Sequence, residues 1–448
     1  MTARSYLDEL AWRGLLFQYT EGAGEMLTGG PIVAYCGFDP TARSLHVGNL
    51  IPVMGLAHLQ RAGHRPIVLV GGGTGMIGDP SGRTSERQLN SLEVVEENVR
   101  GIRHQLERFL DFSGPQGALM RNNAEWLMNL GAIEFMRDVG KHFTVNYMTA
   151  KDSVKSRLDS GISYTEFSYM LLQAYDFLEL YKREGVRMQI GGSDQWGSIT
   201  AGVELIRRSV GVEAHCVTLP LVTTASGAKF GKSEAGAVWL DPSLTSPYKF
   251  YQFWINADDR DVAKYLRYFT LLTREAIEGL EATASERPEA REAQRALAMD
   301  VTSRVHGAAA ARDAADASRL VFDRGADPHQ FASTVLESLT QELPSAAVDL
   351  RTSNGVASVT TADGSAVTIP LKNGSDGAGV DVLDAFVVTG LVKSKGDARR
   401  LLQQGGLYAN GEKLNPENSV LSVHRAIHGT YYVLRKGGRE IAIVRLTT

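Results

Sequence analysis

The chain has 448 residues, of which 43% are apolar and 22% charged, and its net charge is −4 at pH 7. This composition is typical of globular proteins with a large core, so it excludes a mostly disordered chain and a small disulfide-stabilised scaffold. At about 150 residues per domain, the length predicts roughly three domains. The two cysteines, Cys36 and Cys216, lie outside any CxxC motif, which favours a reduced, cytoplasmic setting. No apolar run approaches the ~20 residues of a membrane helix, and the N-terminal segment has no signal-peptide core, so we expect a protein without a membrane span.

The charge is unevenly distributed along the chain. Residues 381–448 contain ten Lys or Arg against six Asp or Glu, a net +4, which leaves −8 for residues 1–380. A basic C-terminal segment on an acidic body fits a polyanionic partner. It fits equally well a solvated surface that happens to be basic.

The N-terminal half alternates short apolar runs with helical patterns. Strands are predicted at 31–38, 66–73 and 187–195, and helices at 50–63, 91–110 and 198–208. Strand, glycine turn and helix recur in this order, which predicts a doubly wound, Rossmann-like α/β fold with a parallel sheet. In such a sheet, ligand sites lie at the carboxyl ends of the strands.

The pattern changes after residue 240. Helices rich in Ala, Glu and Arg follow, and we predict a separate helical domain over 241–342. Residues 351–380 are rich in Gly, Ser and Thr, which indicates a flexible linker or a poorly ordered hairpin, and we place the flexible linker at 343–380. Residues 381–448 are predicted to form a compact unit of their own.

A first candidate site spans residues 39–49, with the sequence DPTARSLHVGN, between a predicted strand and a predicted helix. A histidine and a glycine at a helix N-terminus can form an anion site, because free backbone N–H groups, the helix dipole and the imidazole all attract negative charge. His46 and Gly48 stand in these positions. A single histidine near a helix start is, by itself, more often a surface or capping residue.

Residues 71–80, with the sequence GGGTGMIGDP, contain a GxGxxG pattern after a strand. A dinucleotide-binding fingerprint would require an acidic residue about 20 positions further on, at the end of a second strand. That position falls within the amphipathic helix around Glu96 to Val99, so the dinucleotide interpretation fails. We interpret the glycines as backbone that approaches a ligand closely, and Asp79 as a candidate partner for a ligand ammonium.

A polar stripe is predicted on the helix that follows Ser163, where Ser163 and Glu166 have the spacing of a capping box. Tyr169, Gln173 and Asp176 follow at i, i+4 and i+7, so they lie on one helical face. Among apolar neighbours they would form the hydrogen-bonding wall of a small pocket. A buried structural network or a solvent-facing surface explains the same stripe.

Residues 229–233, with the sequence KFGKS, follow an apolar run at 219–222. Two lysines three residues apart, beside glycine and serine, are suited to a mobile phosphate clamp, although such a segment alone is more often an exposed loop. It is not a Walker A motif, because no GxxxxGK precedes it. The histidines and cysteines show no metal-ligand spacing, so we predict no metal site.

Together these segments resemble the bacterial tyrosyl-tRNA synthetases, a family of class I aminoacyl-tRNA synthetases. The resemblance rests on YCGFDPTA at 35–42, HVGN at 46–49, GGSDQWG at 191–197 and KFGKS at 229–233, in this order. It covers nearly the whole chain, with 343–380 as the exception. HVGN stands where the family has its HIGH signature, and KFGKS where it has KMSKS.

The resemblance implies a role for each matching residue. The residues expected to bind tyrosine are Tyr35 and Asp176 for the phenol, Asp79, Tyr169 and Gln173 for the ammonium, and Gln195 near the carboxylate. The residues expected in the ATP site are Cys36, Gly37, Asp39, Thr41, His46, Gly48, Asn49, Asp194 (on the ribose) and Lys232. The catalytic set expected to act on the phosphates is His46, Asn49, Lys229, Lys232 and Ser233, with Arg83 and Arg87 on a nearby loop. Asn49 replaces the second histidine of the signature, and its amide can still donate a hydrogen bond.

The C-terminal unit, 381–448, resembles the small alpha-L RNA-binding domain. Its basic residues at one predicted helix start, expected to bind RNA, are Lys393, Lys395, Arg399 and Arg400. By the same resemblance, 1–240 is the catalytic domain, and 241–342 is the helical domain on the anticodon side. An insertion around 120–160 includes the candidate subunit contact at 132–148.

We therefore expect a tyrosine–tRNA ligase that activates L-tyrosine with ATP, forming tyrosyl-adenylate and pyrophosphate, and then transfers tyrosine to the 3′ end of tRNA(Tyr). The resemblance implies Mg²⁺ with the ATP, no tightly bound cofactor, and a cytoplasmic homodimer without membrane association. A tryptophanyl-type enzyme is one alternative, which Tyr35 and Asp176 disfavour because they suit a phenol. A non-catalytic RNA-binding or splicing cofactor is another, which His46 and the intact KFGKS segment disfavour.

Overall fold

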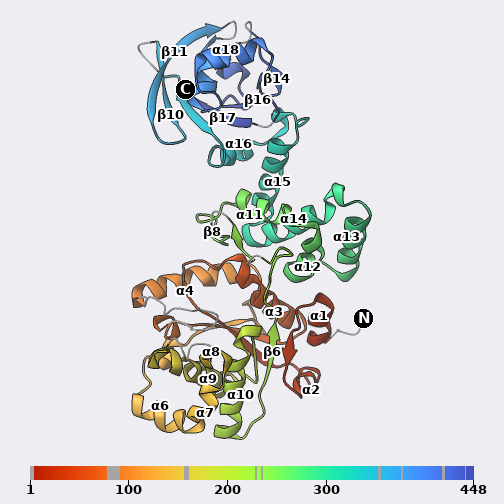
Figure 1. Ribbon diagram of the computed structural model, residues 1–448, viewed down its shortest axis with the longest axis vertical. Helices are drawn as coiled ribbons and strands as arrows, with labels where there is room; N and C mark the ends of the chain where they lie inside the picture. The colour runs from red at the N-terminus through yellow and green to blue at the C-terminus, as the bar shows by residue number, and fades with distance from the viewer. Residues whose placement is uncertain are drawn as a thin grey trace. The chain divides into compact units, whose positions relative to one another are not determined.

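The protein is described here from a computed structural model. The residues described are 5–77, 91–155, 161–227, 230–233, 236–351, 355–374, 377–415, 419–438 and 440–448. The chain folds into two compact units. In Figure 1 its colour runs from red at the N-terminus to blue at the C-terminus. The first contains Met1–Ser246 and Phe253–His306, and the second contains Pro247–Gln252 and Gly307–Thr448.

A six-stranded sheet forms the centre of the first unit, with the strand order β1-β6-β5-β2-β3-β4. Its strands are β1 (Gln18–Tyr19), β2 (Val33–Phe38), β3 (Arg65–Val70), β4 (Leu119–Asn122), β5 (Met188–Gly192) and β6 (His215–Leu219). All neighbouring pairs are parallel except β1 with β6. Because β2 pairs with both β3 and β5, the winding of the sheet reverses between β2 and β5. The carboxyl ends of these two strands are therefore the place where a doubly wound sheet binds its ligand.

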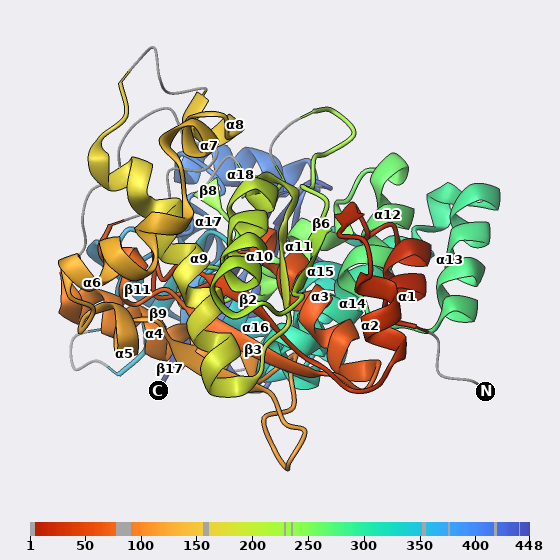
Figure 2. The same ribbon diagram turned by 90° about the horizontal axis from the view of Figure 1, so that it is seen from below.

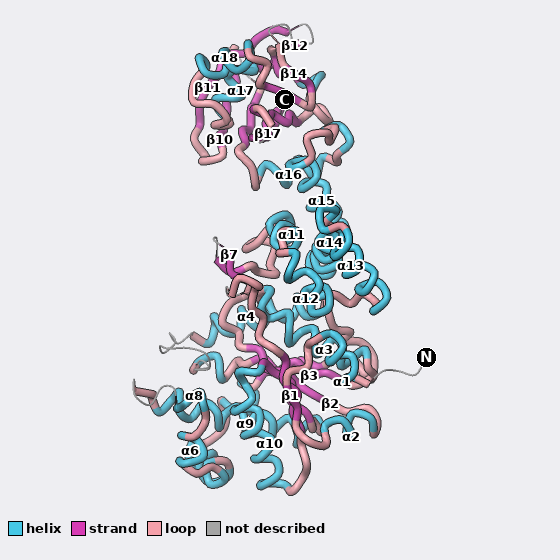
Figure 3. Tube along the Cα trace, turned by 45° about the vertical axis from the view of Figure 1, so that its right-hand side comes forward, coloured by secondary structure: helices cyan, strands magenta, loops and turns pink. Residues whose placement is uncertain are grey.

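Helices lie on both sides of this sheet, whose strands are magenta in Figure 3. α3 packs on β2, β3 and β5, whereas α10 packs on β5 and β6 and has α9 beside it (Figure 2). The helices are α1 (Tyr6–Arg13), α2 (Ala23–Thr28), α3 (Leu50–Arg61), α4 (Leu92–Leu106), α5 (Ala124–Leu127), α6 (Ala132–Asp138), α7 (Val145–Thr149), α8 (Asp152–Lys155), α9 (Tyr164–Glu184) and α10 (Trp196–Val210). The predicted α/β fold is confirmed, and its main elements begin and end within a few residues of their predicted limits.

α9 begins and ends as its sequence predicts. The Ser163 hydroxyl accepts a hydrogen bond from the Glu166 backbone N–H at 3.2 Å, which caps the first turn. The helix ends at Gly185, whose φ of 68° is the left-handed conformation that glycine adopts at low cost. These two ends fix the register of the helix, and with it the direction of the polar stripe.

The region predicted as one helical domain, 241–342, is divided between the two units. The helices are α11 (Pro247–Ile255), α12 (Asp259–Phe269), α13 (Arg274–Glu286), α14 (Glu292–His306), α15 (Ala308–Phe322) and α16 (Ser333–Thr340). α12 to α14 belong to the first unit, α15 and α16 belong to the second, and α11 contributes to both. Among the described residues, no helix is long and apolar enough to cross a membrane.

The second unit contains a nine-stranded sheet with the order β14-β13-β16-β17-β9-β10-β11-β12-β15. Its strands are β9 (Ser345–Asp349), β10 (Val356–Thr361), β11 (Ala366–Gly374), β12 (Gly377–Asp381), β13 (Leu407–Ala409), β14 (Glu412–Lys413), β15 (Val420–Ser422), β16 (Tyr431–Lys436) and β17 (Glu440–Thr447). Two helices, α17 (Val382–Val388) and α18 (Lys395–Gln403), accompany them.

For the described residues of 343–380 the flexible-linker interpretation is wrong, and the hairpin alternative comes closer, because β10 and β11 pair antiparallel. These residues form β9 to β12, and β9 pairs in parallel with β17 in the middle of the sheet. The reason is the alternation along β10, where Ala357 and Val359 are buried while Ser358 and Thr360 are exposed. The small polar residues that suggested flexibility form the solvent-facing side of antiparallel strands.

Candidate active site

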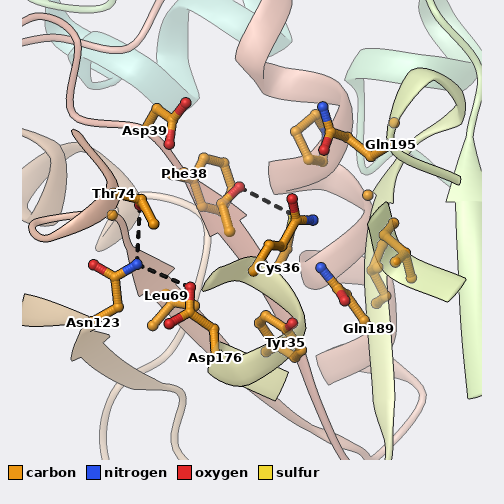
Figure 4. A pocket seen from close by; sticks show the side chains of 18 of the residues that line it. Tyr35, Cys36, Phe38, Asp39, Leu69, Thr74, Asn123, Asp176, Gln189 and Gln195 are labelled. Atoms are coloured by element: carbon orange, nitrogen blue, oxygen red, sulfur yellow. Dashed lines mark hydrogen bonds between the residues drawn. The ribbon is translucent and has the colours of Figure 1, made fainter. Parts of the chain in front are cut away.

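A cavity of about 340 Å³ lies at the carboxyl ends of β2 and β5, where the winding of the sheet reverses. Strand ends, the loop after β2 and one face of α9 form its wall, and Figure 4 shows several of these side chains converging on it. The predicted site residues that line the cavity are Tyr35, Cys36, Gly37, Asp39, Thr41, His46, Asn49, Tyr169, Gln173, Asp176 and Gln195. Of the alternatives that the sequence left open for the polar stripe of α9, the cavity therefore supports the pocket wall.

Asp176 is held by two neighbours in the buried part of the cavity. Its side chain is 3% exposed. One oxygen accepts a hydrogen bond from Asn123 Nδ2 at 2.9 Å, and the other accepts one from the Trp126 indole N–H at 2.7 Å. Burial raises the pKa of Asp176 to about 7, although both of these hydrogen bonds act in the opposite direction. Two neutral donors thus fix a carboxyl group whose charge is poorly solvated.

Tyr35 lies near Asp176 at the end of the cavity (Figure 4). Its ring meets Phe177 edge to face at 5.2 Å, and its hydroxyl is buried without a hydrogen-bond partner among the described residues. Burial first, and then the nearby charge of Asp176, raise the pKa of Tyr35 well above its usual range. Gln189 Oε1 is also buried without a described partner. Two unsatisfied polar atoms in one cavity wall point to a polar ligand.

The glycines after β3 also approach side chains closely, while Gly71 lines the cavity, so their predicted approach to a ligand stays a prediction. A Cβ added to Gly72 would lie 2.1 Å from Asn122 Oδ1, and the Gly72 N–H donates to that same oxygen at 3.1 Å. The Gly73 N–H donates to Asn123 Oδ1 at 2.8 Å, and Asn123 also donates to Thr74 Oγ1. The glycine turn is therefore bonded to the same asparagine that holds Asp176.

His46 and Asn49 both hydrogen-bond across the turn that joins them. His46 precedes the 3₁₀ turn Val47–Asn49, and its Nδ1 accepts from the Gly48 N–H at 3.0 Å. Asn49 Oδ1 accepts from the His46 N–H, also at 3.0 Å. The asparagine that replaces the second histidine of the signature therefore caps the turn from its own end.

The KFGKS segment reaches the HVGN turn through backbone contacts. The Val238 N–H donates to Gly231 O at 3.1 Å, and the Val47 N–H donates to Val238 O at 2.9 Å. Gly231 has a φ of 79°, and a Cβ there would lie 2.9 Å from Val47 Cγ2. Phe230 is buried and stacks on Phe269 of α12 with ring centroids 5.1 Å apart. The segment is thus anchored beside the loop that carries His46.

The remaining predicted residues lie elsewhere. Gly48 is in the turn after His46, and exposed Asp194 is in the 3₁₀ turn Ser193–Gln195, beside Gly192 of the cavity wall. For Lys232 and Ser233 only the backbone is described, in the two-residue strand β7, which pairs with β8 (Gly236–Ala237). The predicted residues outside the described part of the chain are Asp79, Arg83, Arg87 and Lys229.

Sequence reasoning missed Asn123, Trp126 and Gln189. Asn123 and Trp126 follow β4 directly, and Gln189 is in β5. Asparagine at the end of a predicted parallel strand is a usable signal, because strand carboxyl ends meet at one edge of the sheet. That signal requires β4 to be recognised as a strand, and its four residues are only partly buried.

The cavity offers binding groups rather than a nucleophile. Cys36 lies in its wall, but burial raises the pKa of its thiol to about 12, so it stays protonated near neutral pH. The other groups are amides, hydroxyls and carboxylates suited to hydrogen bonding.

The RNA-binding residues predicted in the second unit lie on and beside α18. Lys393, Lys395, Arg399 and Arg400 are all exposed. Lys395 pairs with Asp384, and Arg400 pairs with Asp397. Within the described part of the chain, Lys393 and Arg399 form no ion pair, so carboxylates hold two of the four charges less closely than the other two.

Comparison with known proteins agrees with this fold. Residues 27–323 match the family model described as tRNA synthetases class I (W and Y), and residues 367–444 match the SYY-like C-terminal domain of tyrosine–tRNA ligase. The tyrosine–tRNA ligase of Roseiflexus castenholzii is 49% identical over 443 residues, 98% of this chain and 99% of its own. That of Anaeromyxobacter dehalogenans is 50% identical over 443 residues, 99% of this chain and 100% of its own.

A solved structure gives the same result for most of the chain. The C-terminally truncated mitochondrial tyrosyl-tRNA synthetase of Aspergillus nidulans has a TM-score of 0.65 at 30% identity, covering 71% of this chain and 94% of that one. The chain therefore belongs to the class I tRNA synthetases for tryptophan and tyrosine and, within them, to the bacterial tyrosine–tRNA ligases. The family, the α/β fold class and the ligase function predicted from the sequence are confirmed. As a class I synthetase, the protein uses ATP as a substrate.

Proposed function

We propose that the cavity binds L-tyrosine with its phenol between Tyr35 and Asp176. The observation that carries this proposal is the buried, unpartnered Tyr35 hydroxyl close to a carboxyl group that Asn123 and Trp126 hold in place. A phenol can donate to Asp176 and accept from Tyr35, so it satisfies both groups at once. Phenylalanine would leave both unsatisfied, at a cost of about 1–3 kcal/mol for each buried group.

The rest of the amino acid would lie along the polar stripe of α9. Tyr169 and Gln173, together with Asp79, would bind the α-ammonium, and Gln195 would lie near the carboxylate. The Tyr169 hydroxyl donates to Asp39 Oδ1 at 3.3 Å, which orients its oxygen as an acceptor. An ammonium has three donors and no acceptor, so acceptor oxygens of this kind suit it.

ATP would bind on the side of the cavity formed by the loop after β2 and the end of β5. The residues proposed for this part are Cys36, Gly37, Asp39, Thr41, Gly48, Asp194 and Lys232. Because His46 Nδ1 accepts from Gly48, the proton of the neutral imidazole is on Nε2, which can donate to a phosphate oxygen. Asn49 accepts the His46 N–H through its oxygen, so its amide NH₂ is the group that would donate.

The reaction these residues support is an in-line displacement at phosphorus. A carboxylate oxygen of tyrosine forms a bond to the α-phosphorus of ATP as the bond to the bridging oxygen breaks, releasing pyrophosphate. The nucleophile is already ionised, so alignment and charge stabilisation supply the catalysis. His46, Asn49, Lys229, Lys232 and Ser233 would stabilise the charge that builds on the leaving group. In the second step, a terminal ribose hydroxyl of tRNA attacks the adenylate carbonyl and releases AMP.

Magnesium would accompany the ATP phosphates. Among the described residues, no group of three or more His, Cys, Asp or Glu side chains could hold a metal ion. The ligands of Mg²⁺ would therefore be mainly phosphate oxygens and water, as is common for this ion. The ion would supply positive charge to the departing pyrophosphate.

We further propose a cytoplasmic homodimer that binds tRNA(Tyr) through its C-terminal unit. The insertion around 120–160 carries Met128, Ile133, Met136 and Val145, each between 53% and 78% exposed. Large exposed apolar side chains of this kind mark protein interfaces. Sedimentation of the wild type and of an Ile133→Asp variant would test the dimer, with dissociation expected in the variant.

ATP–pyrophosphate exchange with each of the twenty amino acids tests the central proposal. Exchange that depends on tyrosine is expected, with phenylalanine and tryptophan far weaker. Tryptophan-dependent exchange would favour the tryptophanyl alternative, and no exchange with any amino acid would favour the non-catalytic one. A Gln60→Ala variant, which changes a residue of α3 outside the cavity, controls for differences between protein preparations. Its tyrosine-dependent exchange should equal that of the wild type.

A further inference from the structure

One face of α4 contacts the backbone of residues 40–45, the loop between β2 and His46. Asn98, which is 6% exposed, donates from Nδ2 to Pro40 O at 2.8 Å. Seven residues later, Gln105 accepts the Leu45 N–H at 2.8 Å. Asn98, Gly101 and Gln105 stand at i, i+3 and i+7, so they lie on one side of the helix. Pro40 and Leu45 of the loop therefore meet a single helical face, and Gly101 on that face approaches a third loop residue, Arg43.

Gln105 also joins the loop to the chain that follows KFGKS. Its Nε2 donates to Ser44 Oγ at 3.0 Å, and the Asp241 N–H donates to the same oxygen at 3.1 Å. Ser44 is 4% exposed, and its hydroxyl donates in turn to Leu45 O at 2.7 Å. A serine hydroxyl has one donor and two acceptor sites, and all three are used here.

Residues 238–240, which follow KFGKS, hydrogen-bond to the backbone on both sides of His46. The Leu240 N–H donates to Leu45 O at 2.9 Å, and the Val47 N–H donates to Val238 O at 2.9 Å. His46 lies between these two bonds in sequence. The backbone on either side of His46 is therefore fixed by residues 238–241 on one side and, through Ser44 and Leu45, by α4 on the other.

Gly101 allows the closest of the helix–loop contacts. A Cβ added at this position would lie 2.1 Å from Arg43 O, a backbone atom that cannot move aside without shifting the loop. Its φ is not left-handed, so helix geometry does not require glycine there. In a helix interior, alanine is favoured over glycine. The absence of a side chain at 101 is thus explained by the approach of the loop.

We propose that Asn98, Gly101 and Gln105 of α4 are positioning residues for the ATP-dependent step: they seat loop 40–45 and thereby set the position of His46. The inference rests on the proposed role of His46 at the ATP phosphates. The three residues contact neither cavity nor substrate and act through the loop backbone. Displacing a catalytic group by about 1 Å is enough to reduce a rate about 100-fold.

The test compares three α4 variants with a matched control. Gly101→Ala displaces the loop while favouring the helix, Gln105→Ala removes both hydrogen bonds, and Gln105→Glu keeps the acceptor for Leu45 N–H but loses the donor to Ser44. The control is Gln60→Ala, because the Gln60 amide likewise makes one donor and one acceptor bond, both to the backbone of Asp111, at 2.7 and 2.9 Å. For each variant we would measure tyrosine affinity, thermal unfolding, and kcat and KM for ATP in tyrosine-dependent pyrophosphate exchange.

The expected result is a loss specific to ATP. Gly101→Ala should reduce kcat/KM for ATP about 100-fold and Gln105→Ala about tenfold, with tyrosine affinity within about twofold of the wild type. Gln105→Glu should recover part of the loss, and Gln60→Ala should leave all parameters unchanged. Equal losses of tyrosine and ATP binding, or a loss matched by Gln60→Ala, would overturn the proposal. Tyrosine-dependent exchange by the wild type tests the proposed function separately, whatever the variants do.

Discussion

Asp176 and Tyr35 are 3% and 1% exposed, and a network through Asn123 and Trp126 holds the carboxyl in place. At the other side of the same cavity, Gly37 and Thr41 are exposed, and the lysines expected to act there belong to the KFGKS segment beside it. Recognition in the buried part depends on desolvated hydrogen bonds, which salt hardly screens. On the exposed side it depends on charge, whose effect salt at about 0.1 M largely screens beyond about 10 Å. The first arrangement suits selection of an amino acid, and the second suits stabilisation of charge that appears only during the reaction.

The largest effect expected at the buried end is on the pH dependence of stability. Burial raises the pKa of Asp176 from 3.8 to about 7, so the folded protein binds this proton more tightly than the unfolded chain. The contribution of this proton to the free energy of unfolding is fully present below about pH 4 and is lost as the pH rises through about 7. Three pKa units correspond to about 4 kcal/mol.

The Asp176→Asn variant has no titratable group at this position, so its free energy of unfolding should not show this fall between about pH 4 and pH 8. Relative to the wild type, its free energy of unfolding should therefore increase by up to about 4 kcal/mol between pH 4 and pH 8. Urea denaturation of both proteins across this range measures the difference. Parallel pH dependence in the two proteins would show that Asp176 is solvated like an ordinary surface carboxylate.

At the exposed end, Lys232→Ala should lower the rate of adenylate formation by about 10²–10³-fold with little change in tyrosine affinity. A charge aimed at the leaving group contributes mainly in the transition state, and removing one such donor has an effect of this size. Pre-steady-state formation of the adenylate and equilibrium binding of tyrosine separate the two quantities. A variant that bound tyrosine poorly but reacted at the normal rate would reverse the assignment of the two ends.

A smaller effect is expected on amino-acid selection. Asp176→Asn should weaken tyrosine binding about 10- to 100-fold, and Tyr35→Phe about fivefold, because bonds to a charged group contribute more than neutral ones. Both variants should narrow the preference for tyrosine over phenylalanine, measured as the ratio of kcat/KM in pyrophosphate exchange. Unchanged selectivity in both would mean that the phenol lies elsewhere in the cavity.

The two ends also differ in how far the sequence predicts them. Helical periodicity places Tyr169, Gln173 and Asp176 on one face without any tertiary information, and the structure agrees. Asn123 and Trp126 reach Asp176 from about 50 residues away, through the pairing of β4 with β3. No local pattern encodes such a contact, because the order of strands in the sheet decides it.

Composition misled the prediction for 343–380 in a different way. Gly, Ser and Thr are typical of linkers, but in β10 serine and threonine alternate with buried Ala357 and Val359, and β11 buries Ile369. A period of two is hard to recognise when the inward residues are small and the outward ones are serine and threonine. A cut at Gly379, which the linker interpretation favours for removing the tail, would fall within β12. Point variants are therefore the better test of the C-terminal unit.

The smallest effect is expected on tRNA binding by the exposed basic residues on and beside α18. Lys393→Ala with Arg399→Ala should weaken tRNA binding more than Lys395→Ala with Arg400→Ala, because carboxylates already hold the second pair. Each lost phosphate contact lowers the slope of log affinity against log salt by about 0.9, so the first double variant should lose about 2 units of slope. Filter binding of tRNA(Tyr) at several salt concentrations measures both slopes. Tyrosine-dependent pyrophosphate exchange should be unchanged in both double variants, since the cavity residues all belong to the other unit. If neither pair changes the slope, α18 is not a tRNA contact and its charge is an ordinary solvated surface.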